Sequence, residues 1–210
     1  MFKSLIRFTA MAAGAVALMV TVPGQAQALD NWLNFDDSPS RNSGSFSGGE
    51  FFSGGGGGGG RHSVSIPTKY GPGQIIVSFG DRRLYYVESK GRAISYPIAV
   101  PKPSARWAGV ERVSAKRVNP SWTPTASMRR ENPKLPASVP GGHPRNPLGV
   151  RALYLGNTLY RIHGTDAPWL IGREVSKGCV RMHNADVIDL YNRTRIGARV
   201  TITWSRIASL

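Results

Sequence analysis

The chain has 210 residues, a formal net charge of +15 at pH 7 and one cysteine, Cys179. A single cysteine excludes an intrachain disulfide. The basic excess indicates anionic partners, or else a generic basic surface. The arginines are scattered rather than clustered in a run, which argues against nucleic acid as the partner.

The N-terminus has the pattern of a secretory signal peptide over residues 1–28. Lys3 and Arg7 supply positive charge, residues 8–22 are apolar, and Ala26 and Ala28 are the small residues expected at a cleavage site. The apolar stretch of about 15 residues is short for a membrane span, which needs about 20. We therefore expect an exported protein of the periplasm or cell wall that is soluble after signal cleavage, with an uncleaved signal anchor as the alternative. Export further argues against nucleic acid and favours anionic wall polymers or membrane surfaces.

Residues 29–68 are rich in Ser, Gly, Asn and Asp and include seven consecutive glycines at 54–60. Chain of this composition has little to bury, so it predicts a flexible linker. Residues 69–206 have a length suited to one domain with one core. The sequence thus predicts three parts: signal peptide, disordered linker and a single folded domain.

Within the predicted domain, β-rich runs are separated by turn residues. Residues 75–79 and 84–87 predict a hairpin around Gly80 and Asp81, and 93–100 predict a third strand. Seven prolines between 120 and 147 indicate a long loop over 104–149 without long regular elements. Two further strands are predicted at 152–155 and 159–162, the second ending next to His163.

The C-terminal part predicts a short helix and a closing strand. Asn184 is expected to be the N-cap of the helix, with Val187, Leu190 and Tyr191 on one face. Apolar residues alternate with threonines over 200–204, as in a strand. The predicted fold class is mostly β, a sandwich or barrel with one or two short helices.

Cys179 is the first candidate for a functional residue. Unpaired cysteines are often buried as small hydrophobic residues. Here, however, Ser176, Lys177 and Arg181 surround Cys179 with polar and cationic groups, and Gly178 precedes it. Cationic neighbours lower the pKa of a thiol from about 8.5, so we expect a reactive thiolate.

Histidines allow two readings of this region. His163 is predicted to be the general base for Cys179, because the ordinary pKa of a histidine lies near neutrality. Alternatively, a zinc ion could use Cys179 together with histidines, namely His143, His163 and His183. Structural zinc sites normally use tight paired spacings, and a zinc-bound thiolate could not attack freely. We therefore expect no metal and no cofactor.

Residues from about Gln74 to Trp204 resemble the L,D-transpeptidase catalytic domain, also called YkuD-like. Two motifs carry the resemblance: His-Gly-Thr at 163–165 and Ser-Lys-Gly-Cys-Val-Arg-Met at 176–182. Asn-Pro-Leu-Gly at 146–149 and Asn-Pro-Ser-Trp-Thr-Pro at 119–124 support it. The chain departs from the family pattern at Lys177, where a histidine is often found, and in a shorter gap between His163 and Ser176.

The resemblance implies acyl transfer on peptidoglycan stem peptides. Cys179 would attack the bond between the third residue and the terminal D-alanine of a tetrapeptide stem, and His163 would move the protons. The Gly164 carbonyl would orient the imidazole, and the backbone N–H groups of Gly178 and Cys179 would bind the oxyanion.

Four further residues are predicted to contact the substrate: Tyr160, Ser176, Lys177 and Arg181. For Arg181 the alternative is an ion pair with Asp186 or Asp189. For Ser176 the alternative is a hydrogen bond within the loop.

Three functions remain open at this stage. The first is a transpeptidase whose acyl acceptor is an amine of a second stem or of an envelope protein. The second is an L,D-carboxypeptidase that trims stems by hydrolysis. The third is a non-catalytic basic module that binds the cell wall, and this function alone does not need Cys179.

Overall fold

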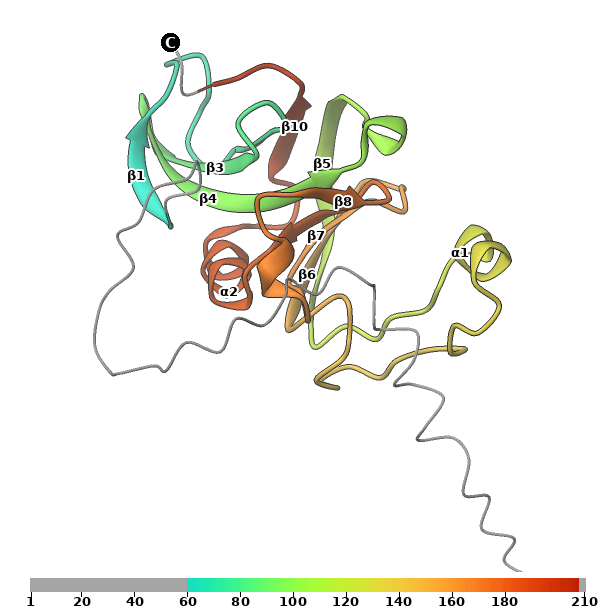
Figure 1. The fold of residues 1–210 in the computed structure, drawn as a ribbon. Coiled ribbons are helices and arrows are strands. Elements are labelled where there is room, and N and C mark those ends of the chain that lie inside the picture. Colours follow the sequence, from blue (N-terminus) through green and yellow to red (C-terminus); the bar gives the residue numbers. More distant parts are fainter. Residues whose placement is uncertain (1–59, 208–210) are drawn as a thin grey trace, which may run out of the picture. The chain divides into compact units, whose positions relative to one another are not determined.

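The computed structural model describes residues 60–207, so the predicted signal peptide and most of the predicted linker lie outside the described residues. Figure 1 shows the arrangement of the elements. The strands are β1 (His62–Ser65), β2 (Ile75–Ser78), β3 (Arg83–Ser89), β4 (Arg92–Pro101), β5 (Gly109–Val118), β6 (Arg151–Leu155), β7 (Arg161–His163), β8 (Glu174–Ser176), β9 (Val180–Met182) and β10 (Arg199–Thr203). The helices are α1 (Ala126–Glu131) and α2 (Asn184–Arg193), with 3-10 turns η2 (Pro103–Ala105) and η3 (Pro168–Leu170).

The strands of the described region close into a barrel. Neighbouring strands follow the order β4-β3-β2-β10-β5-β6-β7-β9, and β9 pairs again with β4 through Ile98↔Met182 and Ala99↔Arg181. β1 pairs with the outer edge of β4, and β8 pairs with the end of β4. The predicted fold class, a mostly β barrel with short helices, is confirmed.

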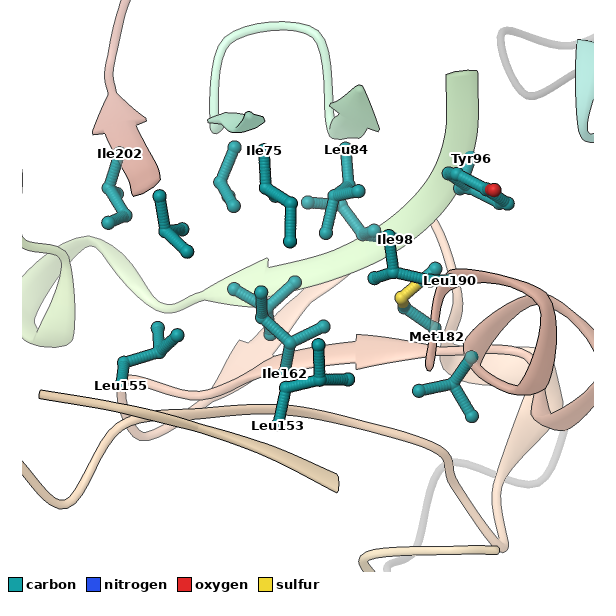
Figure 2. Packing of buried hydrophobic residues seen from close by; sticks show 14 of the residues in the cluster. Ile75, Leu84, Tyr96, Ile98, Leu153, Leu155, Ile162, Met182, Leu190 and Ile202 are labelled. Carbon is teal, nitrogen blue, oxygen red and sulfur yellow. The ribbon is translucent and has the colours of Figure 1, made fainter. Parts of the chain in front are cut away.

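One continuous apolar core fills the barrel (Figure 2). Alternate residues of each strand point inward because side chains in a strand alternate between the two faces. Ile75 and Leu84 from the hairpin meet Leu153 and Ile162 from the opposite wall, all fully buried. Val187 and Leu190 of α2 belong to the same core, as predicted, and Tyr191 packs at its edge.

The β2–β4 part of the barrel is buried on both faces. Ile76, Tyr85 and Ala93 form a second cluster with Ile66 and Ile207 on the outside of these strands. This explains why residues 75–77 form a continuous apolar run rather than an alternating one. No helix between residues 60 and 207 is long and apolar enough to cross a membrane.

Two sequence predictions need correction. The linker prediction is wrong at its C-terminal end, because 62–65 form β1 against β4. The loop prediction for 104–149 missed β5, a strand of ten residues paired with both β10 and β6. The prolines all follow β5, and they leave room for helix α1 as well.

The predicted start of α2 is off by one residue. His183 is the N-cap and Asn184 is the first helical residue. The Asn184 side chain is used elsewhere: its Oδ1 accepts from Thr165 N at 3.2 Å, and its Nδ2 donates to Thr165 O at 3.0 Å. It therefore ties the start of α2 to the loop that follows β7.

Candidate active site

Two neighbouring parallel strands, β7 and β9, place the predicted nucleophile and base on one face. Ile162 pairs with Val180 and His163 pairs with Arg181. Ile162 and Val180 point into the core, so the residues that alternate with them point to the outside of the barrel. Cys179 directly precedes β9 and shares this outer face with His163 and Arg181. The sequence predicted a strand that delivers His163 at its end, and β7 ends at His163.

The ring of His163 is buried and held by the next residue. Its Nδ1 lies 2.6 Å from Gly164 O, which only accepts, so Nδ1 carries the proton and Nε2 has the free lone pair. Burial, assisted by the positive charge of Arg181, lowers the pKa of His163 to about 3. The imidazole is therefore neutral at pH 7 with a free Nε2 lone pair, but in the free protein it is a weaker base than the near-neutral pKa expected from the sequence.

The thiol of Cys179 differs from the sequence expectation. Burial raises its pKa above the ordinary value and outweighs the backbone N–H of Arg161 and the charges of Arg161 and Arg181, which favour the thiolate. The expected thiolate is therefore wrong for the free protein: a neutral thiol is its resting form. The cationic neighbours are present as predicted, but the sequence did not reveal how much of the surrounding chain packs around the partly exposed Cys179.

The described residues show no direct hydrogen bond between Cys179 and His163. Cys179 Sγ instead donates to Leu159 O at 3.8 Å. Catalytic hydrogen bonds are often long before a substrate binds. Proton transfer between Cys179 and His163 stays a prediction.

We expect alkylation of Cys179 to report its raised pKa. Because only the thiolate reacts, the rate with iodoacetamide should rise with a midpoint above the free-thiol value of about 8.5. Intact mass measures the reaction, and the urea-unfolded chain is the control, since Cys179 is the only cysteine. A midpoint near 7 would instead restore the sequence expectation of an activated thiolate.

Gly178 lies in a close contact that only glycine fits. Its φ is +121°, and an added Cβ would lie 2.4 Å from Cε1 of Tyr160. The Tyr160 ring stacks on Trp107 with centroids 4.3 Å apart, and Trp107 Nε1 donates to Gly178 O at 3.0 Å. Trp107, which sequence reasoning did not single out, thus fixes the peptide between Gly178 and Cys179. Tyr160 packs against the cysteine loop, and a contact with substrate stays a prediction.

Trp107→Phe should reduce turnover without unfolding the protein. A peptide C=O and its N–H point in opposite directions, so the bond to Gly178 O also sets the direction of the Cys179 N–H. Phenylalanine keeps the stack on Tyr160 but loses the donor, and we expect a roughly tenfold lower kcat with a small change in KM. Steady-state kinetics and a thermal melt measure the two effects, and an unchanged kcat would show that the bond does not position the peptide.

The other predicted substrate residues contact the protein itself. Ser176 Oγ donates to Cys179 O, which is the loop hydrogen bond that the sequence left open. Lys177 forms an ion pair with Glu131 of α1, so it joins the cysteine loop to the 119–149 segment. Substrate contact by Ser176 and Lys177 stays a prediction.

Arg181 does not form the ion pair with Asp186 or Asp189 that was considered as its alternative role. Asp189 pairs with Arg61 and Arg193 instead. Burial lowers the pKa of Arg181, and the charge of Asp166 opposes this shift. Arg181 therefore faces Cys179 and His163 with one acidic neighbour.

Small and polar residues hold the loop after His163 in place. Gly149, with φ +62°, and Gly164 both lie where a Cβ would collide with Asn184 Oδ1. Asn146 Nδ2 donates to Pro120 O at 2.8 Å and to Pro140 O at 3.0 Å, closing the proline-rich segment. Asn146 and Gly149 belong to the Asn-Pro-Leu-Gly motif, and these contacts explain what the motif does.

The residues described, 60–207, contain no group of three or more His, Cys, Asp or Glu side chains that could hold a metal ion. Of the histidines considered for zinc, His163 binds Gly164 O, and His143 Nδ1 accepts from Arg145 N. His183 lines a shallow hollow with Arg61 and Asp186, away from Cys179.

A sequence model of the YkuD family, described as the L,D-transpeptidase catalytic domain, matches residues 72–202, which is more than half of the chain. This chain belongs to the L,D-transpeptidase family. The match includes β2 to β10 almost completely and both motifs that carry the site.

Curated relatives carry the same family name. The probable L,D-transpeptidase ErfK/SrfK of Escherichia coli K12 is 40% identical over 137 residues, which cover 61% of this chain and 43% of that protein. The putative L,D-transpeptidase YkuD of Bacillus licheniformis is 33% identical and is covered to 82%, with 79% of this chain matched. The chain thus spans less than half the length of the E. coli relative.

Among solved structures, a Brucella melitensis protein described as a probable carnitine operon oxidoreductase is 42% identical to this chain. The match covers 66% of this chain and 89% of the other, with a TM-score of 0.46. Because that score is below 0.5, the assignment to the L,D-transpeptidase family rests on the family model and the curated relatives.

Proposed function

We propose that this member of the L,D-transpeptidase family is an acyltransferase that acts on peptidoglycan tetrapeptide stems with Cys179 as nucleophile. The observation that carries the proposal is the placement of Cys179 and His163 on one outer face of β7 and β9, inside the family-matched segment. A neutral imidazole with a free Nε2, together with a neutral thiol on the same face, is a starting state for general-base catalysis.

In the acylation step, the Cys179 sulfur attacks the carbonyl carbon that precedes the terminal D-alanine, and the thiol proton passes to His163 Nε2. The carbonyl oxygen becomes an oxyanion, for which the backbone N–H groups of Gly178 and Cys179 are the proposed donors. The C–N bond then breaks, His163 returns the proton to the leaving amine, and D-alanine departs. A thioester on Cys179 remains.

In the second step, an amine attacks the thioester and gives its proton to His163. The C–S bond breaks, a new amide forms, and the Cys179 thiol is regenerated. An amine of a second stem would give a cross-link, whereas an amine on an envelope protein would give protein attachment. Water in place of the amine would give the stem trimming of a carboxypeptidase.

Export to the periplasm or cell wall belongs to the same proposal. The signal pattern over 1–28 would deliver the enzyme to its polymer, and the basic charge suits an anionic envelope. Residues 29–59 would then form the tether between the cleavage point and the domain.

The proposal is tested by incubating the purified protein with disaccharide-tetrapeptide fragments and measuring the products by mass spectrometry. Free D-alanine, a thioester adduct on the protein and a cross-linked dimer are the expected products. Tripeptide without dimer would assign the carboxypeptidase reaction. Tetrapeptide that stays intact with both stem and small-amine acceptors would contradict the proposed function.

A further inference from the structure

Arg161 lies beside Cys179 on the outer face of the barrel. Since Ile162 is paired with Val180 in parallel register, the residues just before them, Arg161 and Cys179, are also neighbours. The backbone N–H and the charge of Arg161 both act on the thiol of Cys179. An arginine thus stands next to the atom that attacks the substrate.

The guanidinium of Arg161 has no acidic partner. No ion pair or hydrogen bond of its side chain is present in residues 60–207, and its Nε is buried without an acceptor. Its Cζ lies 5.0 Å from the ring centroid of Tyr154, the residue paired with it on β6. Packing against the aromatic ring holds the guanidinium in a fixed direction. Its outer nitrogens then remain able to donate hydrogen bonds to a ligand.

The charges around the nucleophile are unbalanced. Arg161 and Arg181 both act on Cys179 and on His163, and Asp166 acts on Arg181, whereas Arg161 forms no ion pair within residues 60–207. A partly buried cation without a counter-ion is costly, and an anion that arrives with the substrate relieves that cost. Carboxylate is the anion whose geometry matches the paired nitrogens of a guanidinium.

We propose that Arg161 binds a carboxylate of the acyl-donor stem, next to the bond that Cys179 attacks. The inference rests on the proposed function and adds the group by which the donor is recognised. Two carboxylates of a stem lie near that bond: the terminal one on D-alanine, and the side-chain one of the third residue where that residue carries it. The chemistry at Arg161 is the same for both.

The test compares Arg161→Gln with the unchanged protein on three donors: the free stem, the stem amidated at D-alanine, and the stem amidated at the third residue. A charged hydrogen bond is worth about 10- to 100-fold, so kcat/KM for the free stem should fall by that factor. On the donor that lacks the recognised carboxylate, the two proteins should be equal. Which amide removes the difference identifies the carboxylate.

Arg151→Gln is the matched control. Arg151 also has a buried Nε without an acceptor and lies 5.6 Å from the ring centroid of a tyrosine, but that tyrosine is Tyr191 of α2. A loss caused only by removing a half-buried arginine would appear in both variants. The proposal expects it for Arg161 alone.

A binding measurement separates this inference from the proposed function. In a Cys179→Ala background, the affinity for the free stem should drop about 10-fold or more on Arg161→Gln, whether or not the parent protein turns the stem over. An equal loss of kcat/KM on all three donors, together with slower alkylation of Cys179, would overturn the inference. Arg161 would then act by stabilising the thiolate of Cys179. Unchanged binding and kinetics would overturn it as well.

Discussion

Cys179→Ala is expected to abolish D-alanine release and thioester formation, with a loss of at least about 10⁴-fold in turnover. Every covalent step of the proposed reaction passes through its sulfur, and no second cysteine is present in the chain. Alanine is smaller than cysteine and fits the site, and the hydrogen bond that it loses to Leu159 O is a long one, 3.8 Å. The thermal midpoint should therefore stay close to that of the unchanged protein.

Binding of wall fragments by Cys179→Ala separates catalysis from simple attachment. If the parent protein shows no turnover and both proteins bind peptidoglycan equally, the basic wall-binding module becomes the better description. Residual release of D-alanine by Cys179→Ala would contradict the nucleophile directly. Cys179→Ser is a useful companion, because it keeps a hydroxyl of similar shape while losing the reactivity of sulfur.

His163→Gln is expected to slow acylation by about 10³-fold, within the range that a positioned general base contributes. Glutamine keeps a neutral polar group near Gly164 O but cannot accept and return the proton. The rate of thioester formation by intact mass measures this step alone. A loss below tenfold would show that another group removes the thiol proton.

The pH dependence of kcat/KM gives a second test of the environment of His163. Its pKa is lowered to about 3, so the imidazole stays neutral as the pH falls from 8 to 5. Protonation of His163 in the free protein should therefore not reduce kcat/KM in that range, and a decline centred near 6.5 would contradict the buried environment. A stem carboxylate close to Arg161 and Arg181 would offset their charge and strengthen the base when the donor binds.

The sequence predicted the elements whose pattern is local and strong. The hairpin of β2 and β3 could be predicted from its apolar runs alone, because both of its faces are buried. β5 was missed because, among its ten residues, only Val113 is buried, and the charged residues around it resemble a loop. β8 and β9 have three residues each, which is too short for the alternation of apolar and polar residues in a strand to be recognised.

The sequence motifs predicted which residues belong to the candidate site, but they did not predict how burial and charge affect those residues. The Gly164 carbonyl lies against the His163 ring, where the family resemblance expected it. The raised pKa of Cys179 depends on how the surrounding chain covers the sulfur, which no spacing in the sequence expresses. Trp107 was missed for the same reason, since it reaches Gly178 from a segment far away in the chain.

The pairing of β9 with β4 links the closure of the barrel to the segment that carries Cys179. β9 completes the circle of hydrogen bonds and begins directly after Cys179, and Met182 of β9 is buried in the core. An opening of the barrel between β4 and β9 would therefore disturb the segment next to Cys179 and expose Met182 to solvent. We expect backbone amides of β9 to exchange with solvent as slowly as those of the barrel's most protected strands.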